Sequence, residues 1–392
     1  MAAQGQQQTV RAEDVAHMGI TEVLLHAPFI FRQYRKLVAS LKQHKPDVAV
    51  LIDFPDVNFR LAKHLRRLGV PVVWFVSPQL WAWKRRRLRW VQQRVDKMLV
   101  IFPFEESFYR ERGVDAEFVG HPLATQPQCQ LSREAYAATH HLDPAKTWIA
   151  LLPGSRWKEI RANLPALHEL AVSDLIAAAA ANTTFDAAGL HSPTDPAAHT
   201  QFEFLLPVAS TIDTTKLNGI LAHLNAQHLR YFGPEGAAPT AAPRLTLVPD
   251  AREALHHARA SVVASGTATV LAAIVGNPFV VVYRVSALTF ALAKKLVQYP
   301  PELPAPRDLD GNPPVAMVNL IAGRRVVPEL LQGRFTAANL ASALAPLLAE
   351  TPQRTAQIAA LAEVRSRLLA TGTASPIERV AEAVLGLLNP HP

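Results

Sequence analysis

Short apolar runs of strand length alternate with helical stretches along most of this chain, and this alternation constrains the fold more than any other feature of the sequence. In the first third, such runs occupy residues 47–52, 70–76, 96–102 and 116–119, with helical patterns between them. Each run is mostly apolar, as expected for a strand that is buried on both faces. Buried strands joined by helical crossovers predict a parallel α/β sheet.

The same pattern begins again after a polar helical stretch at residues 131–141. Further strands are predicted at residues 147–152, 203–207, 244–248, 260–264 and 278–283. Two α/β domains therefore fit the chain best, joined near residues 122–131. Residues 180–200 form a polar insertion rich in Ala and Thr, and the six prolines of residues 300–314 predict a loop. Residues 337–388 predict a run of Ala- and Leu-rich helices.

Composition excludes several classes of protein. The 392 residues are 49% hydrophobic and 18% charged, which excludes an intrinsically disordered chain. A net charge of +8 favours anionic partners such as phosphates, acidic lipid headgroups or nucleic acid. Cys129 is the only cysteine, so the chain can form no internal disulfide and no multi-cysteine zinc cluster. The histidines show no paired ligand spacing, and we therefore predict no metal site.

The sequence carries no signal for secretion or for a membrane span. Residues 1–8 are polar and lack the apolar stretch of a secretory signal. The most apolar segment, residues 270–283, falls short of the ~20 apolar residues that a span requires. Together with the single cysteine, these features predict a reducing, cytoplasmic compartment.

An acidic residue, Asp53, follows the first predicted strand directly. Ligands of open α/β sheets bind at the carboxyl ends of the strands, so Asp53 stands where a substrate would lie. A carboxylate there can take a proton from an attacking hydroxyl. The alternative is that Asp53 or Asp56 only caps the next helix.

Two small turns follow predicted strands in the second half. Gly154-Ser155-Arg156 lies between a strand and a helix, where backbone N–H groups attract phosphate and an arginine adds a bidentate donor. Ser265-Gly266-Thr267 repeats the arrangement after residues 260–264. Two such turns in one domain predict a diphosphate site, although capping alone would also explain Ser265 and Thr267.

Two further features leave alternatives open. Residues 81–90 (WAWKRRRLRW) are basic and aromatic, and could contact nucleic acid or an anionic membrane, or form a helix with a solvated basic face. The apolar stretch at residues 23–31 is followed by Arg32, Arg35 and Lys36 and offers a similar surface. His121, after the last strand of the first half, is a weak catalytic candidate, because a lone histidine is more often structural.

Taken together and in order, these segments resemble the lipid-A-disaccharide synthase family of bacterial GT-B-type glycosyltransferases. The matching segments are residues 18–20 (MGI), 53–61 (DFPDVNFRL), 76–84 (VSPQLWAWK), 102–109 (FPFEESFY), 118–123 (FVGHPL), 151–156 (LLPGSR), 264–269 (ASGTAT), 283–284 (YR) and 319–332 (NLIAGRRVVPELLQ). They span roughly residues 18–332, and nine segments in register are far more specific than one.

The resemblance implies two Rossmann-like domains facing a cleft. Residues 1–125 would form the acceptor-side domain, residues 126–350 the UDP-sugar-binding domain, and residues 351–392 C-terminal helices that could pack back on the first domain. The implied reaction is inverting transfer of 2,3-diacylglucosamine from its UDP derivative to 2,3-diacylglucosamine 1-phosphate. The products are the β-1,6-linked lipid A disaccharide phosphate and UDP, and the family needs no metal or other cofactor.

The resemblance also implies roles for individual residues. Asp53 matches the proposed general base, which would deprotonate the 6-hydroxyl of the acceptor. The departing diphosphate would be stabilised by Gly154, Ser155, Arg156, Ser265, Gly266 and Thr267. Residues that match motifs on the nucleotide side are Tyr283, Arg284, Asn319 and Arg324. Because both substrates are lipids, the implied location is cytoplasmic and peripheral on the anionic inner membrane, with no nucleic-acid partner and with a homodimer left open.

Two departures from the family pattern stand out. The family begins with a strand and a Gly-Glu-Ala-Ser-Gly-Asp turn, whereas only residues 1–17 precede Met18 here. We therefore expect the first domain to be shortened at its N-terminus and to expose a sheet edge or a core face. The family also has a Glu, suited to the uridine ribose, where this chain has Leu271, which cannot accept a hydrogen bond.

These departures motivate a second hypothesis, a catalytically impaired member of the family that binds a UDP-sugar without turnover. A third hypothesis, a nucleic-acid-binding protein, rests on the net charge and on residues 81–90.

Overall fold

The computed structural model describes residues 20–173, 201–232 and 245–388, together with isolated positions at residues 5–10 and 175–179. Met18, Gly19 and the predicted insertion at residues 180–200 lie outside the described residues. The chain divides into two compact units: Met1–Pro122 with Ala370–Pro392, called unit 1, and Leu123–Leu369, called unit 2.

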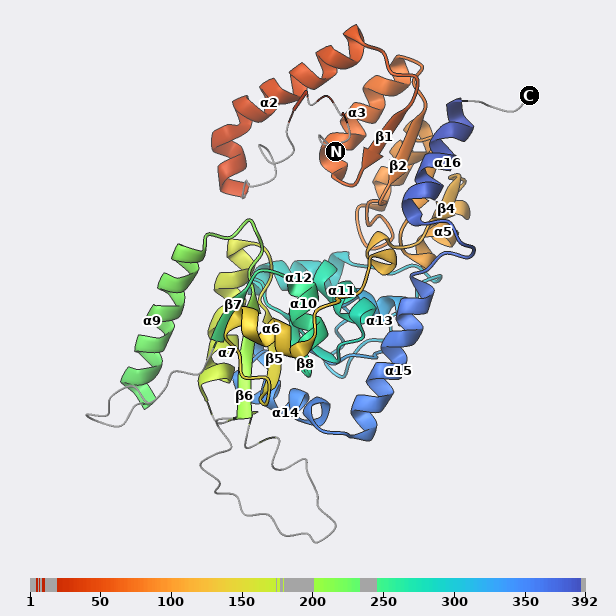
Figure 1. Ribbon diagram of the computed structural model, residues 1–392. Coiled ribbons are helices and arrows are strands. Elements are labelled where there is room, and N and C mark those ends of the chain that lie inside the picture. The colour runs from red at the N-terminus through yellow and green to blue at the C-terminus, as the bar shows by residue number, and fades with distance from the viewer. Residues whose placement is uncertain are drawn as a thin grey trace. The chain divides into compact units, whose positions relative to one another are not determined.

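Unit 1 is built on a parallel sheet with the strand order β1–β2–β3–β4 (Figure 1). Its strands are β1 (Ala49–Ile52), β2 (Val72–Phe75), β3 (Lys97–Val100) and β4 (Ala116–Phe118). Its helices are α2 (Ile20–Gln43), α3 (Pro55–Arg67), α4 (Leu88–Arg94), α5 (Pro103–Arg110) and α16 (Pro376–Leu388). The strand order follows the order in the sequence, since each crossover carries the chain to the next position in the sheet.

Helix α3 shows how the sequence produces this layer. Pro55 is the first residue of the helix, where the N–H that proline lacks would have no partner within the helix. The helix ends at Arg67, and the chain changes direction at Gly69, whose φ is +67°. Between them Phe59, Ala62 and Leu65 are buried, at spacings of three residues that place them on one face. This face packs against β1 and β2.

Strand β1 lies at the edge of the unit 1 sheet, and no described strand pairs with its outer side. Val50 and Ile52, two residues apart and therefore on the same face, are 38% and 45% exposed. In β2, the neighbouring interior strand, all four residues are buried. Among the described residues, β1 is therefore an edge strand with two exposed apolar side chains.

Unit 2 is built on a parallel sheet with the order β10–β9–β8–β5–β6–β7 (Figure 1). The strands are β5 (Thr147–Leu152), β6 (Phe202–Pro207), β7 (Leu245–Val248), β8 (Ala260–Ala264), β9 (Phe279–Tyr283) and β10 (Glu329–Leu331). The helices are α6 (Arg133–His140), α7 (Trp157–Val172), α9 (Thr214–Phe232), α10 (Ala251–His257), α11 (Thr267–Val275), α12 (Ala287–Leu296), α13 (Met317–Ala322), α14 (Ala337–Leu348) and α15 (Pro352–Arg367).

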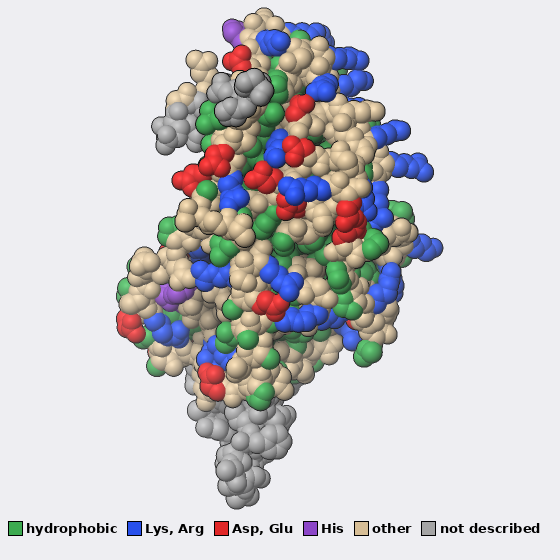
Figure 2. Space-filling model, turned by 90° about the vertical axis from the view of Figure 1, so that its right-hand side faces the viewer, with side chains coloured by type: hydrophobic (Ala, Val, Ile, Leu, Met, Phe, Trp, Pro, Cys, Tyr) green, Lys and Arg blue, Asp and Glu red, His purple; other side chains and the backbone are tan. Residues whose placement is uncertain are grey.

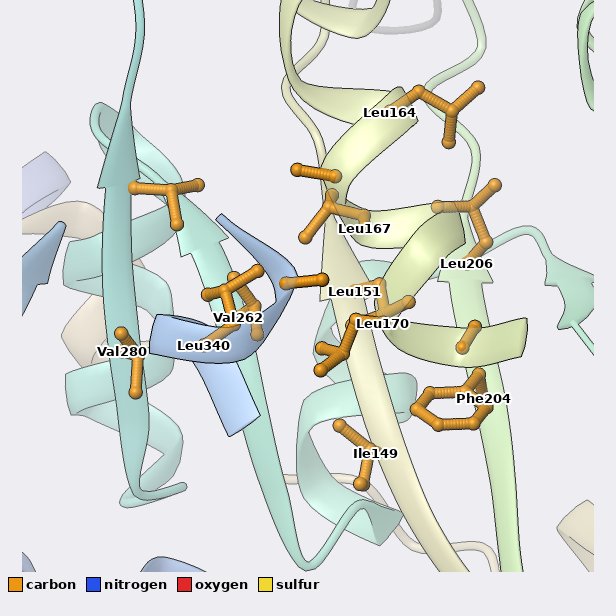
Figure 3. Close-up of a cluster of buried hydrophobic side chains, with 14 of the residues drawn as sticks. Ile149, Leu151, Leu164, Leu167, Leu170, Phe204, Leu206, Val262, Val280 and Leu340 are labelled. Atoms are coloured by element: carbon orange, nitrogen blue, oxygen red, sulfur yellow. The ribbon is translucent and has the colours of Figure 1, made fainter. Parts of the chain in front are cut away.

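The core of unit 2 fills the space between this sheet and two helices, α7 and α14. Figure 3 shows strand residues of β5, β6, β8 and β9 facing helix residues, namely Ile149, Leu151, Phe204, Leu206, Val262 and Val280 with Leu164, Leu167, Leu170 and Leu340. The intervening strand residues, among them Trp148 and Val263, are also buried, and α10 and α11 contact the strands as well. Coverage on both faces explains why the strands read as unbroken apolar runs.

The predicted fold class, two parallel α/β units followed by helices, is confirmed. Each predicted strand is present, and the prediction missed only β10 among the described strands, because its three residues include a glutamate. The units divide after Pro122, close to the predicted boundary at residue 125. The predicted C-terminal segment, residues 351–392, is itself divided, since α15 belongs to unit 2 and α16 to unit 1.

Candidate functional site

The carboxyl ends of β5, β8 and β9 lie side by side at one edge of the unit 2 sheet. β8 pairs with β5, where Leu152 is opposite Val263, and with β9, where Ala264 is opposite Val282. The two turns predicted to hold phosphate follow β5 and β8, so the structure brings them to the same edge. Tyr283 ends β9 and belongs to this edge too. This is the edge at which open α/β sheets bind ligands.

The turn after β5 is closed by a carboxylate of its own helix. Gly154 has φ +118°, and a Cβ at this position would lie 2.5 Å from Glu159 Oε2, so only glycine fits. The backbone N–H of Ser155 donates to Glu159 Oε2 (3.0 Å), and Arg156 Nη1 donates to Glu159 Oε1 (3.1 Å). Glu159 thus occupies the position in which the N-terminus of α7 would hold an anion. A phosphate can bind there only by displacing this carboxylate.

The turn after β8 is open. Gly266 is the N-cap of α11 with φ +147°, and it has no side chain to accept hydrogen bonds from the first N–H groups of the helix. Ser265 is not the cap, since its hydroxyl donates to Val315 O (2.9 Å) instead. The interpretation that Ser265 and Thr267 serve only as caps is therefore wrong. Because Gly266 and Thr267 are exposed, the N-terminus of α11 is prepared to bind an anion.

Two arginines predicted on the nucleotide side are bound by protein groups. Arg284 donates to Ala162 O (3.3 Å) and to the carbonyl of Phe335, and its guanidinium lies 4.5 Å from the centre of the Phe335 ring. Arg324 donates to Glu363 of α15 (2.7 Å). Tyr283 remains half-buried at the edge, where burial raises the pKa of its hydroxyl and the nearby Glu159 carboxylate adds to that effect.

Asn319 lies inside unit 2 rather than on its surface. It is fully buried, its Nδ2 donates to Glu329 Oε1 (2.8 Å), and its Oδ1 accepts from the backbone of Val326 (2.7 Å). Glu329 in turn accepts from the N–H of Val315 (3.1 Å), the residue whose carbonyl binds Ser265. Hydrogen bonds thus connect Asn319 to the β8 turn through Glu329 and Val315.

In unit 1, Asp53 lies on a strained turn at the carboxyl end of β1. Its φ is +45° and that of Phe54 is +43°, a left-handed conformation that residues other than glycine rarely adopt. Asn58 holds the turn, since its Nδ2 donates to the carbonyls of Ile52 (3.1 Å) and Asp53 (2.7 Å). Phe54 is the N-cap of α3, so the alternative that Asp53 or Asp56 caps this helix is wrong. The exposed side chain of Asp53 on a strained backbone supports a functional role.

Sequence reasoning missed Glu105, a fully buried carboxyl behind the ends of β2 and β3. Its Oε1 accepts from Ser77 Oγ (2.7 Å) and Trp81 Nε1 (3.0 Å), and its Oε2 accepts from the N–H of Phe102 (3.1 Å). Burial raises the pKa of this carboxyl to about 7, against the lowering effect of these hydrogen bonds. A glutamate three residues after Phe102, at the third position of α5, is the signal of a capping box that could have identified it.

The raised pKa of Glu105 predicts a pH-dependent stability. The folded chain keeps the Glu105 proton up to about pH 7, whereas an unfolded glutamate loses it near pH 4.5. The protonated carboxyl therefore makes its full contribution to the free energy of unfolding below pH 4.5. That contribution is lost as the pH rises from 4.5 towards 7. Glu105→Gln cannot titrate, and the difference in unfolding free energy between parent and variant should change by about 3 kcal/mol between pH 5 and pH 8. Urea unfolding at both pH values measures it, and a difference that does not vary with pH would contradict the prediction.

His121 is buried, with its ring 5.6 Å from that of Phe102. Burial lowers the pKa of His121 to about 4, so the imidazole is neutral near pH 7. A neutral, buried imidazole is typical of a structural histidine, the alternative that the sequence favoured.

The basic aromatic segment at residues 81–90 is not one helix with a solvated face. Arg85–Arg87 form a single 3-10 turn, and α4 begins only at Leu88. Trp81 is 2% exposed, and Trp90 packs edge-on against Phe59 at 5.5 Å. These two tryptophans offer no open platform for base stacking, whereas Trp83 is 46% exposed with Lys84 over its ring, so a single open ring is left for the nucleic-acid hypothesis in this segment.

Around Trp90 lies a pocket of about 390 Å³ in unit 1. Its floor is aromatic, and the guanidinium groups of Arg87 and Arg94 lie 5.5 and 5.1 Å from the centre of the Trp90 ring. Arg60 and Lys63 of α3 add further cations, while Asp56 pairs with Arg87 (2.7 Å). The lining therefore favours an anionic group with an apolar portion.

Comparison with known proteins identifies the family. The family model described as lipid-A-disaccharide synthetase matches residues 1–185 and 238–381. The chain is 50% identical over 392 residues to the lipid-A-disaccharide synthase of Acidobacterium capsulatum, covering 99% of this chain and 87% of the relative. It is 45% identical to that of Koribacter versatilis, covering 99% of this chain and 88% of the relative. The prediction of a shortened first domain stays a prediction.

A solved structure, the S. aureus MnaA–UDP co-structure, shares the fold with a TM-score of 0.51 and 12% identity, covering 93% of this chain and 82% of that one. The family match covers most of the chain and includes all nine segments that carried the resemblance, and two relatives are 50% and 45% identical to the chain. The chain therefore belongs to the lipid-A-disaccharide synthase family.

Proposed function

We propose that this protein transfers 2,3-diacylglucosamine from its UDP derivative to 2,3-diacylglucosamine 1-phosphate and releases UDP. Membership of a family whose relatives are named for this synthase supports the reaction. The observation that carries the site assignment is the parallel pairing of β5 with β8, because it sets two glycine turns beside each other at one sheet edge. Two adjacent anion sites suit a diphosphate.

The first step is binding of the donor. One phosphate lies at the N-terminus of α11, over Gly266 and Thr267, and the other replaces Glu159 on the N–H of Ser155. Displacement of Glu159 also releases Arg156, whose side chain is 81% exposed, to bind phosphate oxygens. Negative charge grows on UDP as it departs, and Arg156 and the two helix N-termini stabilise that charge without a metal.

The second step is attack by the acceptor. Asp53 takes the proton of the acceptor 6-hydroxyl as the hydroxyl oxygen forms its bond to the anomeric carbon of the donor. The bond from that carbon to the UDP oxygen breaks, and its electron pair leaves with UDP. A single displacement from the face opposite UDP inverts the anomeric configuration.

A second candidate function is favoured by one residue. Leu271, in α11 one turn after Thr267, cannot hydrogen-bond the uridine ribose, so the chain would bind the UDP-sugar weakly and turn over slowly or not at all. Mass spectrometry of a reaction with both lipid substrates separates the two functions. The synthase gives the disaccharide 1-phosphate, whereas the impaired enzyme gives only bound donor.

We further propose that the protein attaches peripherally to an anionic membrane, because both of its substrates carry acyl chains. No helix among the described residues is long and apolar enough to span a bilayer. Figure 2 shows Lys and Arg side chains along the right-hand edge of the upper part of the view, which is unit 1. Helix α12, which has no buried residue, adds an apolar stripe that the sequence did not reveal: Leu288, Leu292 and Leu296 are 81%, 54% and 56% exposed beside Lys294 and Lys295.

Replacing Arg85, Arg86 and Arg87 together with Ser should weaken attachment to vesicles that contain phosphatidylglycerol. Each basic residue near an anionic surface contributes ~1 kcal/mol, and salt screens the contribution. Sedimentation with vesicles at low and high salt measures the loss. Replacing Leu288, Leu292 and Leu296 with Ser is the parallel test of α12. If the arginine variant binds as well as the parent, the basic segment is only a solvated surface and α12 or residues 23–31 make the contact.

A further inference from the structure

The fold brings Cys129 to the two adjacent histidines at the end of α10, a cluster that the proposed reaction does not use. One ligand atom from each of Cys129, His256 and His257 lies within 4.8 Å of the others. Cys129 Sγ is 3.6 Å from His257 Nε2. All three residues belong to unit 2.

The spacing fits a transition metal. Zinc binds thiolate sulfur at about 2.3 Å and imidazole nitrogen at about 2.0–2.1 Å, so a tetrahedral angle places the sulfur and the nitrogen about 3.6 Å apart. The distance between Cys129 Sγ and His257 Nε2 has this value before any metal is bound. The exposed ring of His256 lies edge-on to that of His257, with 4.8 Å between the ring centres, and offers the third ligand.

The surrounding residues hold the cluster in place. Arg252 of α10 fixes the segment that carries Cys129, since it donates to the carbonyls of Leu123 (3.0 Å) and Pro127 (3.2 Å). The buried ring of His257 stacks on Tyr136 at 4.4 Å. Two side chains, one on the loop and one on the helix, are therefore aligned before a metal arrives, which reduces the cost of ordering them.

The charged and titratable side chains that face His257 are Arg133, Glu134, His140 and His256, so basic groups outnumber acidic ones around the cluster. Arg133 is committed to the carbonyls of Pro144 (3.0 Å), Lys146 (2.6 Å) and His257 (3.0 Å), so its guanidinium is held in place by the backbone. An ion bound there would displace the thiol proton of Cys129, and the sulfur would supply one negative charge to the ion.

From this geometry we infer that Cys129, His256 and His257 form a binding site for zinc, with a fourth position left to water. One thiolate and two imidazoles are the ligands that a borderline-soft divalent ion prefers. The ion would tie the loop after Leu123 to the C-terminus of α10 and stabilise unit 2. The site lies outside the residues assigned to transfer, so the inference does not depend on the proposed function.

The test uses untagged full-length protein and ZnCl₂, with a chromophoric chelator as competitor. The parent should bind one Zn²⁺, and Cys129→Ser and His256→Ala should each weaken binding at least ~10-fold. His223→Ala, which removes an exposed histidine on α9, is the matched control and should bind as the parent does. Zn²⁺ should also raise the Tm of the parent but not that of Cys129→Ser.

Co²⁺ supplies a second readout that does not depend on stability. The parent and His223→Ala should show a thiolate-to-cobalt charge-transfer band, and Cys129→Ser should lack it. A far-UV circular dichroism spectrum that matches the parent's confirms that each variant is folded. Zinc affinity that Cys129→Ser or His256→Ala leaves unchanged, or a cobalt complex without the thiolate band, would overturn the inference and leave an ordinary hydrogen bond between Cys129 and His257.

Discussion

Asp53→Asn is expected to lower the rate of transfer by ~10²–10⁴-fold while leaving the affinity for UDP unchanged. The asparagine keeps the size of the side chain and fits the left-handed backbone at this position, because Asn tolerates that conformation well. It cannot, however, take the proton of the acceptor hydroxyl. UDP is assigned to residues of unit 2, so its binding should not sense the change. Initial rates and UDP titration calorimetry on the same preparation measure both quantities.

Asp56→Asn is the matched control, since Asp56 is a second exposed carboxylate, in the first turn of α3, and pairs with Arg87. This control should retain most of the activity. Near-normal turnover by Asp53→Asn, or an equal loss in both variants, would remove Asp53 from the role of general base.

Arg156→Ala should weaken both UDP binding and turnover, with a loss of ~10–100-fold in affinity, because a hydrogen bond to a charged group is worth ~1.5–3 kcal/mol. Turnover should fall further than affinity, since the charge on the UDP oxygen grows as the bond to the sugar breaks. Glu159 now binds the Arg156 guanidinium and the N–H of Ser155. Glu159→Gln removes this competing charge and should therefore strengthen UDP binding.

Lys158→Ala is the control for charge alone, because Lys158 is an exposed cation two residues further along the same chain segment. If Arg156→Ala and Lys158→Ala bind UDP equally well, the diphosphate lies elsewhere. Residues 265–267 would then be the better assignment for both phosphates.

The sequence predicted the sheets well, because strands buried on both faces leave apolar runs that helical crossovers separate. It also predicted two phosphate-binding turns in one domain, and the pairing of β5 with β8 places both at the same edge of the sheet. The family motif predicted that Asn319 lies beside the nucleotide. In the structure Asn319 is buried and hydrogen-bonded to Glu329. A short polar residue in a matched motif carries no signal of whether it faces a ligand or a buried carboxylate.

Other features depend on contacts that no local pattern encodes. Glu159 resembles any acidic residue in the first turn of a helix, and only the structure shows that it closes the Gly154 turn. The left-handed backbone of Asp53 and Phe54 could not be predicted, because no glycine at these positions indicates a positive φ. Cys129 and His257 are 128 residues apart, so spacing in the sequence could not predict the cluster, and the prediction of no metal site considered only local spacing.

Acceptor-dependent release of UDP tests the central claim most directly. UDP and disaccharide are quantified together, in reactions that contain UDP-2,3-diacylglucosamine with and without 2,3-diacylglucosamine 1-phosphate. Transfer between two sugars predicts one UDP for each disaccharide formed, and almost no UDP when the acceptor is left out. Release of UDP at the same rate without acceptor, or no release in its presence, would contradict the assignment of this chain as the synthase.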